Sequence, residues 1–261
     1  MPRFVSFLLL IFISTTLHAQ TWEVGGFAGG SAYMGDLNQY NPVKVSGIAL
    51  GAFVQRNFNG YLSAKINYTY GQISGADNTS SNPQLRERNL SFTTQLNELA
   101  LIGEFNFFKY IPKVGENRWT PYIYLGIGAV GYNPQATYQG QKYDLRPLET
   151  EGESKPYSNI AATFPYGVGV KYNIAGAWNL SADIGYRNPS TDYLDDVSGK
   201  YANPANLKSD LSRALADRSG ETTGNYIGVP GTQRGDLRPK DTYMFVGFSI
   251  SFTFLTSKCY Y

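Results

Sequence analysis

The sequence lacks the residues on which most enzyme sites depend. Its 261 residues include one histidine, His18, and one cysteine, Cys259. If the N-terminal segment is cleaved as expected below, no imidazole is left, which excludes a serine nucleophile with a histidine base and zinc held by histidine. One cysteine also excludes an internal disulfide framework. We therefore expect a protein that is not an enzyme, with no cofactor and no metal.

Charge and long apolar runs are also scarce. Only 16% of the residues are charged and the formal net charge is +2, which gives no argument for nucleic-acid binding. One apolar run, residues 4–13, follows Arg3 and precedes Ala19, as is typical of a secretory signal peptide; we expect it to be residues 1–19, cleaved after Ala19. No other apolar stretch reaches the roughly 18 residues that a transmembrane helix needs, so such helices are excluded.

Aromatic residues and glycine, by contrast, are abundant, with 21 Tyr, 15 Phe and 28 Gly, which favours a β-rich chain. Residues 244–254 show strict strand alternation. One face carries Met244, Val246, Phe248, Ile250, Phe252 and Phe254, and the other carries Gly247, Ser249, Ser251 and Thr253. The chain has no second layer large enough to cover the apolar face, so we expect that face to contact lipid.

Seven earlier segments read as strands of similar length: 22–33, 47–58, 62–70, 95–108, 121–132, 166–174 and 178–187. The connections alternate between short and long, with the longest at about 133–163 and 188–241. This predicts an all-β fold, an eight-stranded antiparallel transmembrane β-barrel over 20–254 with short periplasmic turns and long extracellular loops, followed by a periplasmic tail, 255–261. A soluble sandwich or lipocalin-like barrel is disfavoured, because its outer face would carry more charge.

Aromatic residues at the strand ends predict the two membrane interfaces. We place Trp22, Trp119 and Trp178 at the periplasmic interface. The outer girdle is expected to contain Tyr33, Tyr70, Tyr132, Tyr186 and Tyr243.

The polar face of the strands predicts a charged barrel interior. It contains Lys65, Glu98, Glu104, Lys171, Asp183 and Arg187. Three positive and three negative groups neutralise one another, and eight strands leave only enough width for side chains. We interpret these residues as a structural polar core, with a narrow conduction path as the weaker alternative.

Two features stand out in the last long loop. Asp192, Asp195 and Asp196 offer oxygen ligands for calcium, but their spacing does not match an EF-hand, so we favour a hydrogen-bonded turn. Leucines at 207, 211 and 215 predict one short amphipathic helix within 204–220. That helix is expected to cap the barrel mouth, and docking of another protein is the alternative.

Five segments together resemble the PorG-type outer-membrane proteins of the type IX secretion system. They are Tyr33-Met34-Gly35-Asp36-Leu37, Gly131-Tyr132-Asn133-Pro134, YDLRPLETEG at 143–152, TDYLDDVSGKY at 191–201, and Arg234-Gly235-Asp236. The most specific piece begins Thr191, Asp192, Tyr193, Leu194, Asp195, Asp196. The resemblance covers the whole mature chain.

The resemblance implies a structural outer-membrane component of this protein-secretion apparatus, and of gliding motility in some bacteria. Its implied partners are the lipoprotein of a periplasmic ring and that lipoprotein's soluble ring partner. It also implies insertion by the barrel assembly machinery, whose signal Gly247, Ile250 and Phe252 resemble. The alternative function is a stand-alone OmpA- or OmpW-like barrel that binds or passes a small molecule.

The tail provides one residue-level hypothesis about the ring. Lys258, Cys259, Tyr260 and Tyr261 are expected to contact it, with an intermolecular disulfide through Cys259. A free thiol at a frayed terminus is the equally weighted alternative.

Overall fold

The computed structural model describes residues 21–113, 115–236 and 238–254. The expected signal peptide, 1–19, and the tail with Lys258, Cys259, Tyr260 and Tyr261 lie outside this part of the chain. The strands are β1 (Thr21–Met34), β2 (Val45–Asn57), β3 (Leu62–Ala76), β4 (Ser91–Asn106), β5 (Trp119–Tyr138), β6 (Gln141–Asp144), β7 (Ile160–Ala175), β8 (Trp178–Pro189) and β9 (Thr242–Phe254). The helical elements are η1 (Asp77–Thr79), α2 (Pro83–Arg88), η2 (Arg146–Leu148), η3 (Pro204–Asn206), α3 (Asp210–Ala216) and α4 (Gly220–Thr223).

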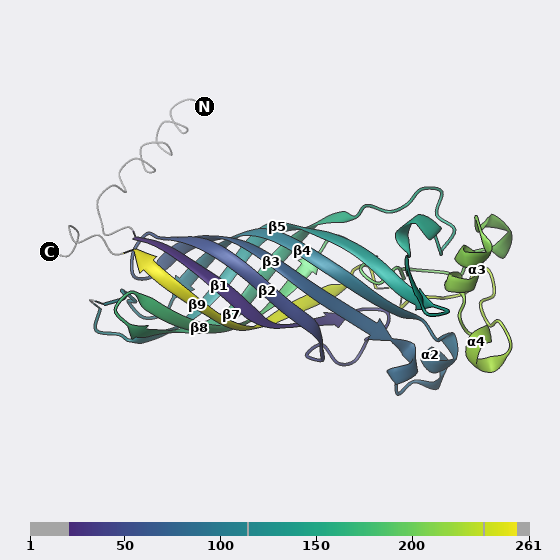
Figure 1. Cartoon of the computed structure of the whole chain (residues 1–261), viewed down its shortest axis with the longest axis horizontal. Helices are drawn as coiled ribbons and strands as arrows, with labels where there is room; N and C mark the ends of the chain where they lie inside the picture. Colours follow the sequence, from purple (N-terminus) through teal and green to yellow (C-terminus); the bar gives the residue numbers. More distant parts are fainter. Residues whose placement is uncertain (1–20, 114, 237, 255–261) are drawn as a thin grey trace, which may run out of the picture.

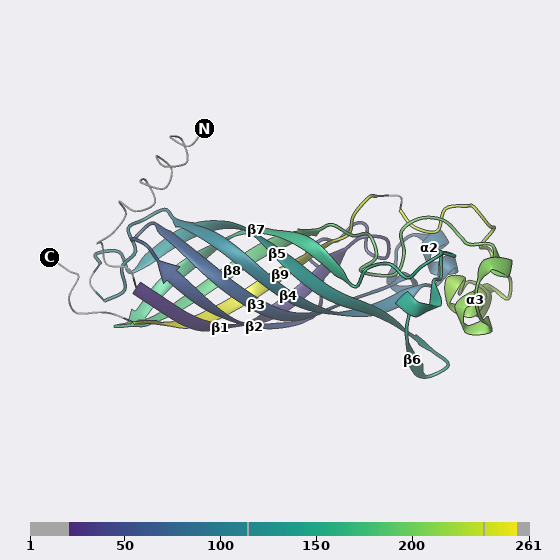
Figure 2. The same cartoon turned by 90° about the horizontal axis from the view of Figure 1, so that it is seen from above.

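The strands form a closed antiparallel barrel (Figures 1 and 2). Of the nine strands in the sheet, β6 pairs only with β5, and the other eight form the wall. Each wall strand pairs with its neighbours in the chain, and the pairing of β1 with β9 closes the ring. The expected eight-stranded antiparallel barrel is therefore confirmed.

The two ends of the barrel differ (Figure 1). At one end lie the start of β1, the end of β9 and the connections 58–61, 107–118 and 176–177, which we call the short-turn end. In the first turn the Asn59 side chain accepts hydrogen bonds from the backbone N–H groups of Tyr61 and Leu62, at 2.8 and 2.9 Å. At the other end lie the connections 35–44, 77–90, 139–159 and 190–241, which we call the loop cap.

The outer wall of the barrel is apolar. In β4, every second side chain from Phe92 to Asn106 is buried inside, while Leu99 and Leu101 point outward. Leu125 and Phe248 are 71% and 64% exposed. Other exposed apolar side chains on the wall are Ile48, Leu50, Ile66, Ile123, Ile127, Val168, Val170 and Ile250. A continuous apolar band of this kind suits the hydrocarbon of a bilayer, not water.

The helices are short by comparison. In the described residues, none is long and apolar enough to cross a membrane.

The expected outer tyrosine girdle is wrong for three of its members. Tyr33, Tyr132 and Tyr243 are buried. Each lies on the inward-facing side of its strand and packs in one cluster with residues of the loop cap. The three tyrosines therefore belong to the core at the barrel mouth. Met244 was expected to face lipid but is also buried, at a position of β9 that pairs with Ala32 of β1 and Tyr186 of β8.

The long connections contain more regular structure than expected. β5 continues to Tyr138 and turns into β6, so the expected loop from 133 begins as a hairpin. Gly140, with φ at 80°, forms that turn. The helix expected within 204–220 is present as the shorter α3, whose N-terminus is capped by the Ser209 side chain. It contains Leu211 and the buried Leu215, but Leu207 precedes it.

Candidate functional site

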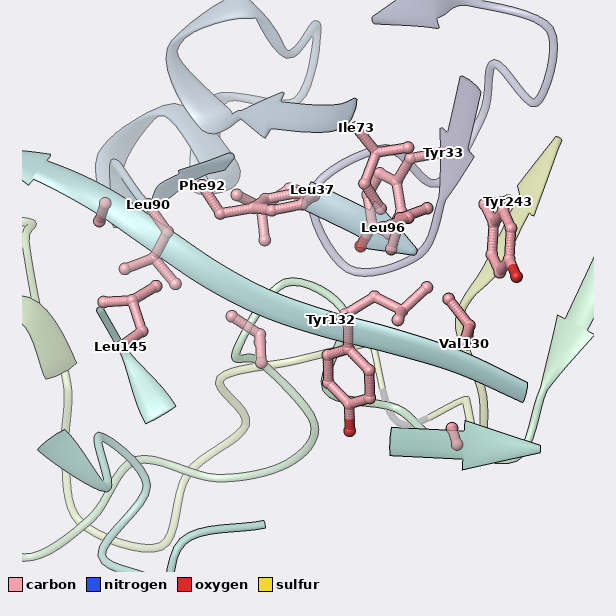
Figure 3. Packing of buried hydrophobic residues seen from close by; sticks show 14 of the residues in the cluster. Tyr33, Leu37, Ile73, Leu90, Phe92, Leu96, Val130, Tyr132, Leu145 and Tyr243 are labelled. Atoms are coloured by element: carbon pink, nitrogen blue, oxygen red, sulfur yellow. The ribbon is translucent and has the colours of Figure 1, made fainter. Parts of the chain in front are cut away.

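The main apolar core lies at the barrel mouth, under the loop cap. Figure 3 shows Tyr33, Ile73, Leu96 and Val130 of the wall near Leu37, Leu90 and Leu145 of the loops. Leu194, Val197 and Leu215 of the last loop belong to the same cluster. The loops therefore share one core with the barrel, and the predicted capping role of the α3 segment agrees with this packing.

The segment TDYLDDVS is tied to this core by its backbone. Leu194 is fully buried; its carbonyl accepts a hydrogen bond from Thr94 Oγ1 at 2.5 Å, and its N–H donates to Asp241 Oδ2 at 3.0 Å. Asp195 accepts from the N–H of Val197 at 2.9 Å and from the hydroxyl of Tyr33. The segment is thus an ordered turn inserted into the mouth, as favoured from its composition.

Asp196 is held in this turn by two hydroxyl groups. Thr150 Oγ1 and Tyr157 Oη each donate to its carboxylate at 2.6 Å. Burial raises the pKa of Asp196 to about 7, and the guanidinium of Arg234 and the two hydroxyls only partly oppose this effect, while Glu153 adds to it. The carboxyl group therefore changes charge near neutral pH.

We expect the loop cap to open more easily as pH rises from 5 to 8. The folded pKa of Asp196 lies above the ordinary value of about 4, so the folded state binds the proton more tightly. Protonated Asp196 therefore stabilises the closed loop cap, and this contribution is fully present below about pH 4. It is lost as pH rises through 7, and the free energy of opening falls by at most about 1.4 kcal/mol per pH unit for this group. Hydrogen exchange of the amides of 193–198, corrected for intrinsic rates, measures it. Asp196→Asn should remove the contribution of Asp196 from this slope and leave those of Asp36 and Asp192, and an unchanged slope in that variant would contradict the assignment.

Two buried arginines join the loops to one another. Arg88 pairs with Asp77 through two hydrogen bonds of 2.7 Å, and it also donates to the carbonyl oxygens of Asp36 and Arg234 at 3.0 and 2.5 Å. Arg234 in turn pairs with Glu151 at 3.0 Å and donates to the Asp196 carbonyl at 2.8 Å. Arg88 therefore joins the loops 35–44, 77–90 and 190–241, and Arg234 joins the last of these to the fourth loop, 139–159.

Three carboxylates also meet in the loop cap. Asp36, Asp192 and Asp241 each offer an oxygen, and these oxygens lie within 4.8 Å of one another. Asp36 and Asp241 are buried, and Asp192 is half-buried. Burial, followed by the negative charge of Asp236, raises the pKa of Asp36 and of Asp192 to about 7. Oxygen-only groups of this kind are suited to hard cations such as Ca²⁺.

The charged residues predicted for the barrel interior lie there in two groups. Lys65 Nζ lies 2.6 Å from Glu104 Oε1, and Lys171 binds the other oxygen of Glu104. Asp183 accepts hydrogen bonds from the hydroxyls of Tyr122 and Tyr124 at 3.2 and 3.4 Å.

The second group lies nearer the loop cap. Arg187 Nε lies 3.4 Å from Glu98 Oε2, which also accepts from the Tyr243 hydroxyl at 2.6 Å, and the guanidinium lies 4.5 Å from the ring centroid of Phe245. Glu23, which sequence reasoning missed, is a further interior acid; it accepts from Asn57 Nδ2 at 3.1 Å. The first strand is rich in glycine and alternates only weakly, so its sequence did not show whether Glu23 faces the interior or the lipid.

The interior is filled between these groups. A cavity of ≈ 20 Å³ lies among Phe27, Phe53, Lys65, Tyr124 and Arg187. That volume holds about one water molecule, so the barrel at this level is a packed polar core with no room for a hydrated ion.

The residues predicted for the membrane interface lie together at the short-turn end. Trp22, Trp119 and Trp178 each begin a strand there and are each 50% exposed. Trp178 and Phe252 pack edge to face with ring centroids 5.2 Å apart, beside the pairing of Trp22 with Phe254. Of the predicted assembly signal, Ile250 points outward and Gly247 inward.

Comparisons with known proteins support a family relation in sequence and leave the function open. A family model described as "Domain of unknown function (DUF6089)" matches residues 2–211. Among curated proteins, none matches the chain.

Three similar solved structures are distant in sequence. Neisserial surface protein A is 11% identical with a TM-score of 0.43, covering 89% of this chain and 97% of that one. A major outer membrane protein from Thermus thermophilus is 14% identical with a TM-score of 0.43, covering 91% of this chain and 100% of that one. The outer membrane protein OprG from Pseudomonas aeruginosa is 10% identical with a TM-score of 0.43, covering 91% of this chain and 98% of that one. Likenesses this distant carry nothing about function.

Proposed function

This chain belongs to the DUF6089 family, whose domains are of unknown function, and we propose that it is a structural component of the type IX secretion apparatus in the bacterial outer membrane. In this role the barrel anchors the apparatus in the membrane, and its short-turn end associates with the lipoprotein ring and the soluble ring partner in the periplasm. In gliding bacteria the same assembly supports motility.

The convergence of the PorG-like segments carries this proposal. Tyr33 of the first segment hydrogen-bonds Asp195 of the fourth. Thr150 of the third hydrogen-bonds Asp196 of the fourth at 2.6 Å, and Arg234 of the fifth pairs with Glu151 of the third at 3.0 Å. Chance matches scattered along a chain have no reason to contact one another, so this mutual packing supports a shared structural unit.

The filled interior also favours a structural role over transport. The buried charges of Glu104 and Glu98 are matched by Lys171 of β7 and Arg187 of β8, and the cavity beside them admits no more than about one water. At the short-turn end, in contrast, the side chains of Phe107, Phe108 and Lys109 are exposed. We therefore place the partner contacts at that end, together with the tail from 255 onward.

We expect a tagged copy, purified from detergent-solubilised outer membrane, to bring down a periplasmic lipoprotein in near-stoichiometric amount, as identified by mass spectrometry. A reducible higher-mass band that disappears in Cys259→Ser would show that the contact includes a disulfide. Recovery of the barrel alone, under conditions that keep other membrane complexes intact, would contradict the proposal.

Charge reversal at the two ends gives a matched control. Lys109→Glu with Arg118→Glu alters exposed cations of the short-turn end and should reduce recovery of the lipoprotein. Lys142→Glu with Lys155→Glu makes the same change at the loop-cap end and should leave recovery unchanged. An equal loss in both variants would mean that the short-turn end is not the contact.

A second candidate, a stand-alone barrel that binds a small molecule, is favoured by one hollow. A groove of ≈ 370 Å³ lies beside the loop cap, lined by residues that include Lys44, Ser74, Phe92 and Gln135. Its size falls within the range of small-ligand pockets. Ligand binding at this groove, with the barrel recovered alone in the purification above, would support this candidate over the secretion role.

A further inference from the structure

Two loops of the cap bring an uncompensated group of carboxylates together. Asp36 comes from the first long connection, and Asp192 and Asp241 come from the beginning and the end of the last one. One oxygen of each lies within 4.8 Å of the others. Segments so far apart in the chain converge here although their charges repel one another.

The orientation of these carboxylates is set by neighbouring donors. Asp241 accepts from the Tyr33 hydroxyl at 3.2 Å through Oδ1 and from the Leu194 N–H at 3.0 Å through Oδ2. Asp36 Oδ1 accepts from the N–H of Asp236. Each of these bonds leaves a lone pair on the accepting oxygen, so the group is held in place and can still bind a ligand.

One oxygen in the group has no partner at all. Asp36 is 1% exposed, and its Oδ2 is buried without any hydrogen-bond partner. Asp36 Oδ1 already accepts from the backbone of Asp236, so Oδ2 is the oxygen of this carboxylate that is free to bind a ligand shared with Asp192 and Asp241. A buried carboxylate oxygen without a partner is costly, and a bound cation would remove that cost.

The nearby cations are engaged elsewhere. Arg88 and Arg234 form ion pairs with Asp77 and Glu151, at 2.7 and 3.0 Å. Arg238 pairs with Asp236 at 3.4 Å. In residues 21–113, 115–236 and 238–254, no ion pair within 4.0 Å includes Asp36, Asp192 or Asp241.

We propose that Asp36, Asp192 and Asp241 form a calcium site that fastens the first and last long loops to each other. The ligands are all hard oxygen atoms, with no histidine or cysteine among them. Oxygens that lie within 4.8 Å of one another fit around calcium, whose ligands at about 2.3–2.6 Å take a flexible geometry, whereas magnesium demands a near-ideal octahedron. The half-buried Asp192 lets the ion and its remaining water ligands reach the site.

Direct titration of the full chain, refolded in detergent micelles, tests the site. We expect CaCl₂ to bind saturably by calorimetry and to displace Tb³⁺, whose luminescence is sensitised by the adjacent Tyr33. Asp192→Asn should weaken calcium binding by about tenfold or more, because one charged ligand is lost. Calcium should also slow proteolysis of 190–241 in the wild type, and much less so in Asp192→Asn.

Asp210→Asn is the matched control, since this carboxylate lies in the same loop with its side chain 99% exposed. It should bind calcium like the wild type. Far-UV circular dichroism without calcium checks that each variant has folded, and the isosteric change at Asp192 removes a repulsive charge, so it should fold. The absence of saturable binding at millimolar CaCl₂, a preference for MgCl₂, or equal affinity in the Asp192 and Asp210 variants would overturn the proposal.

Discussion

Replacing Glu104 by glutamine is expected to lower the free energy of unfolding of the barrel by about 3–5 kcal/mol, the range for breaking a buried ion pair from one side. Glu104 lies in the interior, where Lys65 Nζ is 2.6 Å from one of its oxygens and Lys171 binds the other. Glutamine keeps the shape but leaves two ammonium groups facing an uncharged amide. The cost is large because the side chains of Lys65 and Lys171 are only 12% and 8% exposed, so water compensates little of the lost charge.

Tryptophan fluorescence during guanidinium unfolding in lipid vesicles measures this change, because Trp22, Trp119 and Trp178 sit at the lipid-facing wall and report loss of the barrel. The matched control is Glu116→Gln, which makes the same chemical change at an exposed position of the short-turn end and should alter the free energy by less than about 0.5 kcal/mol.

A compensated variant separates the charge effect from a packing effect. Combining Glu104→Gln with Lys171→Met removes one charge of each sign and leaves Lys65 with Asp183, which lines the same cavity. This variant should recover most of the lost stability, since buried ion pairs are often replaced by apolar groups without loss. If Glu104→Gln were no less stable than Glu116→Gln, Glu104 would not hold these two lysines in place.

The wall of the barrel could be predicted from the sequence because its two faces differ in chemistry at every second residue. In β4 the alternation of Leu99 and Leu101 with Glu98 determines which side meets lipid, and the structure agrees. The environment of the tyrosines at the strand ends was harder to predict, because tyrosine is suited both to a membrane interface and to a barrel mouth that is covered by loops. The phase of Tyr243 pointed inward, but only the position of the loop cap shows that an aromatic ring is buried there.

The candidate calcium site could not be predicted for a different reason. Asp192, Asp195 and Asp196 are close in sequence but serve different roles, since Asp196 is bound by two hydroxyls and Asp195 by Tyr33 and Val197. The residues that meet Asp192 are Asp36, which lies in another loop, and Asp241, which lies at the other end of the same loop. No spacing pattern in the sequence relates the three. The interior pairs were easier, because strand phase alone brings Glu104 and Lys171 to the same side of the wall.

The second large effect is expected at Arg88, where replacement by methionine should open the loop cap while the barrel stays folded. Arg88 neutralises the fully buried Asp77 and donates to carbonyl oxygens of two other loops, at Asp36 and Arg234. Its loss leaves Asp77 without a counter-charge, at a cost of about 3–5 kcal/mol, which corresponds to roughly 10²–10⁴-fold faster hydrogen exchange of the cap amides.

Arg86→Met in the same helix, α2, is the matched control for Arg88→Met, because Arg86 is exposed and its side chain donates to the carbonyl of Ser80, at 2.8 Å. It should leave exchange in the cap nearly unchanged. Adding Asp77→Asn to Arg88→Met removes the unpaired charge and should restore part of the protection, since the remaining loss then comes only from the hydrogen bonds to Asp36 and Arg234. If cap amides in Arg88→Met exchanged as slowly as in Arg86→Met, the apolar core at the barrel mouth alone would hold the loops in place.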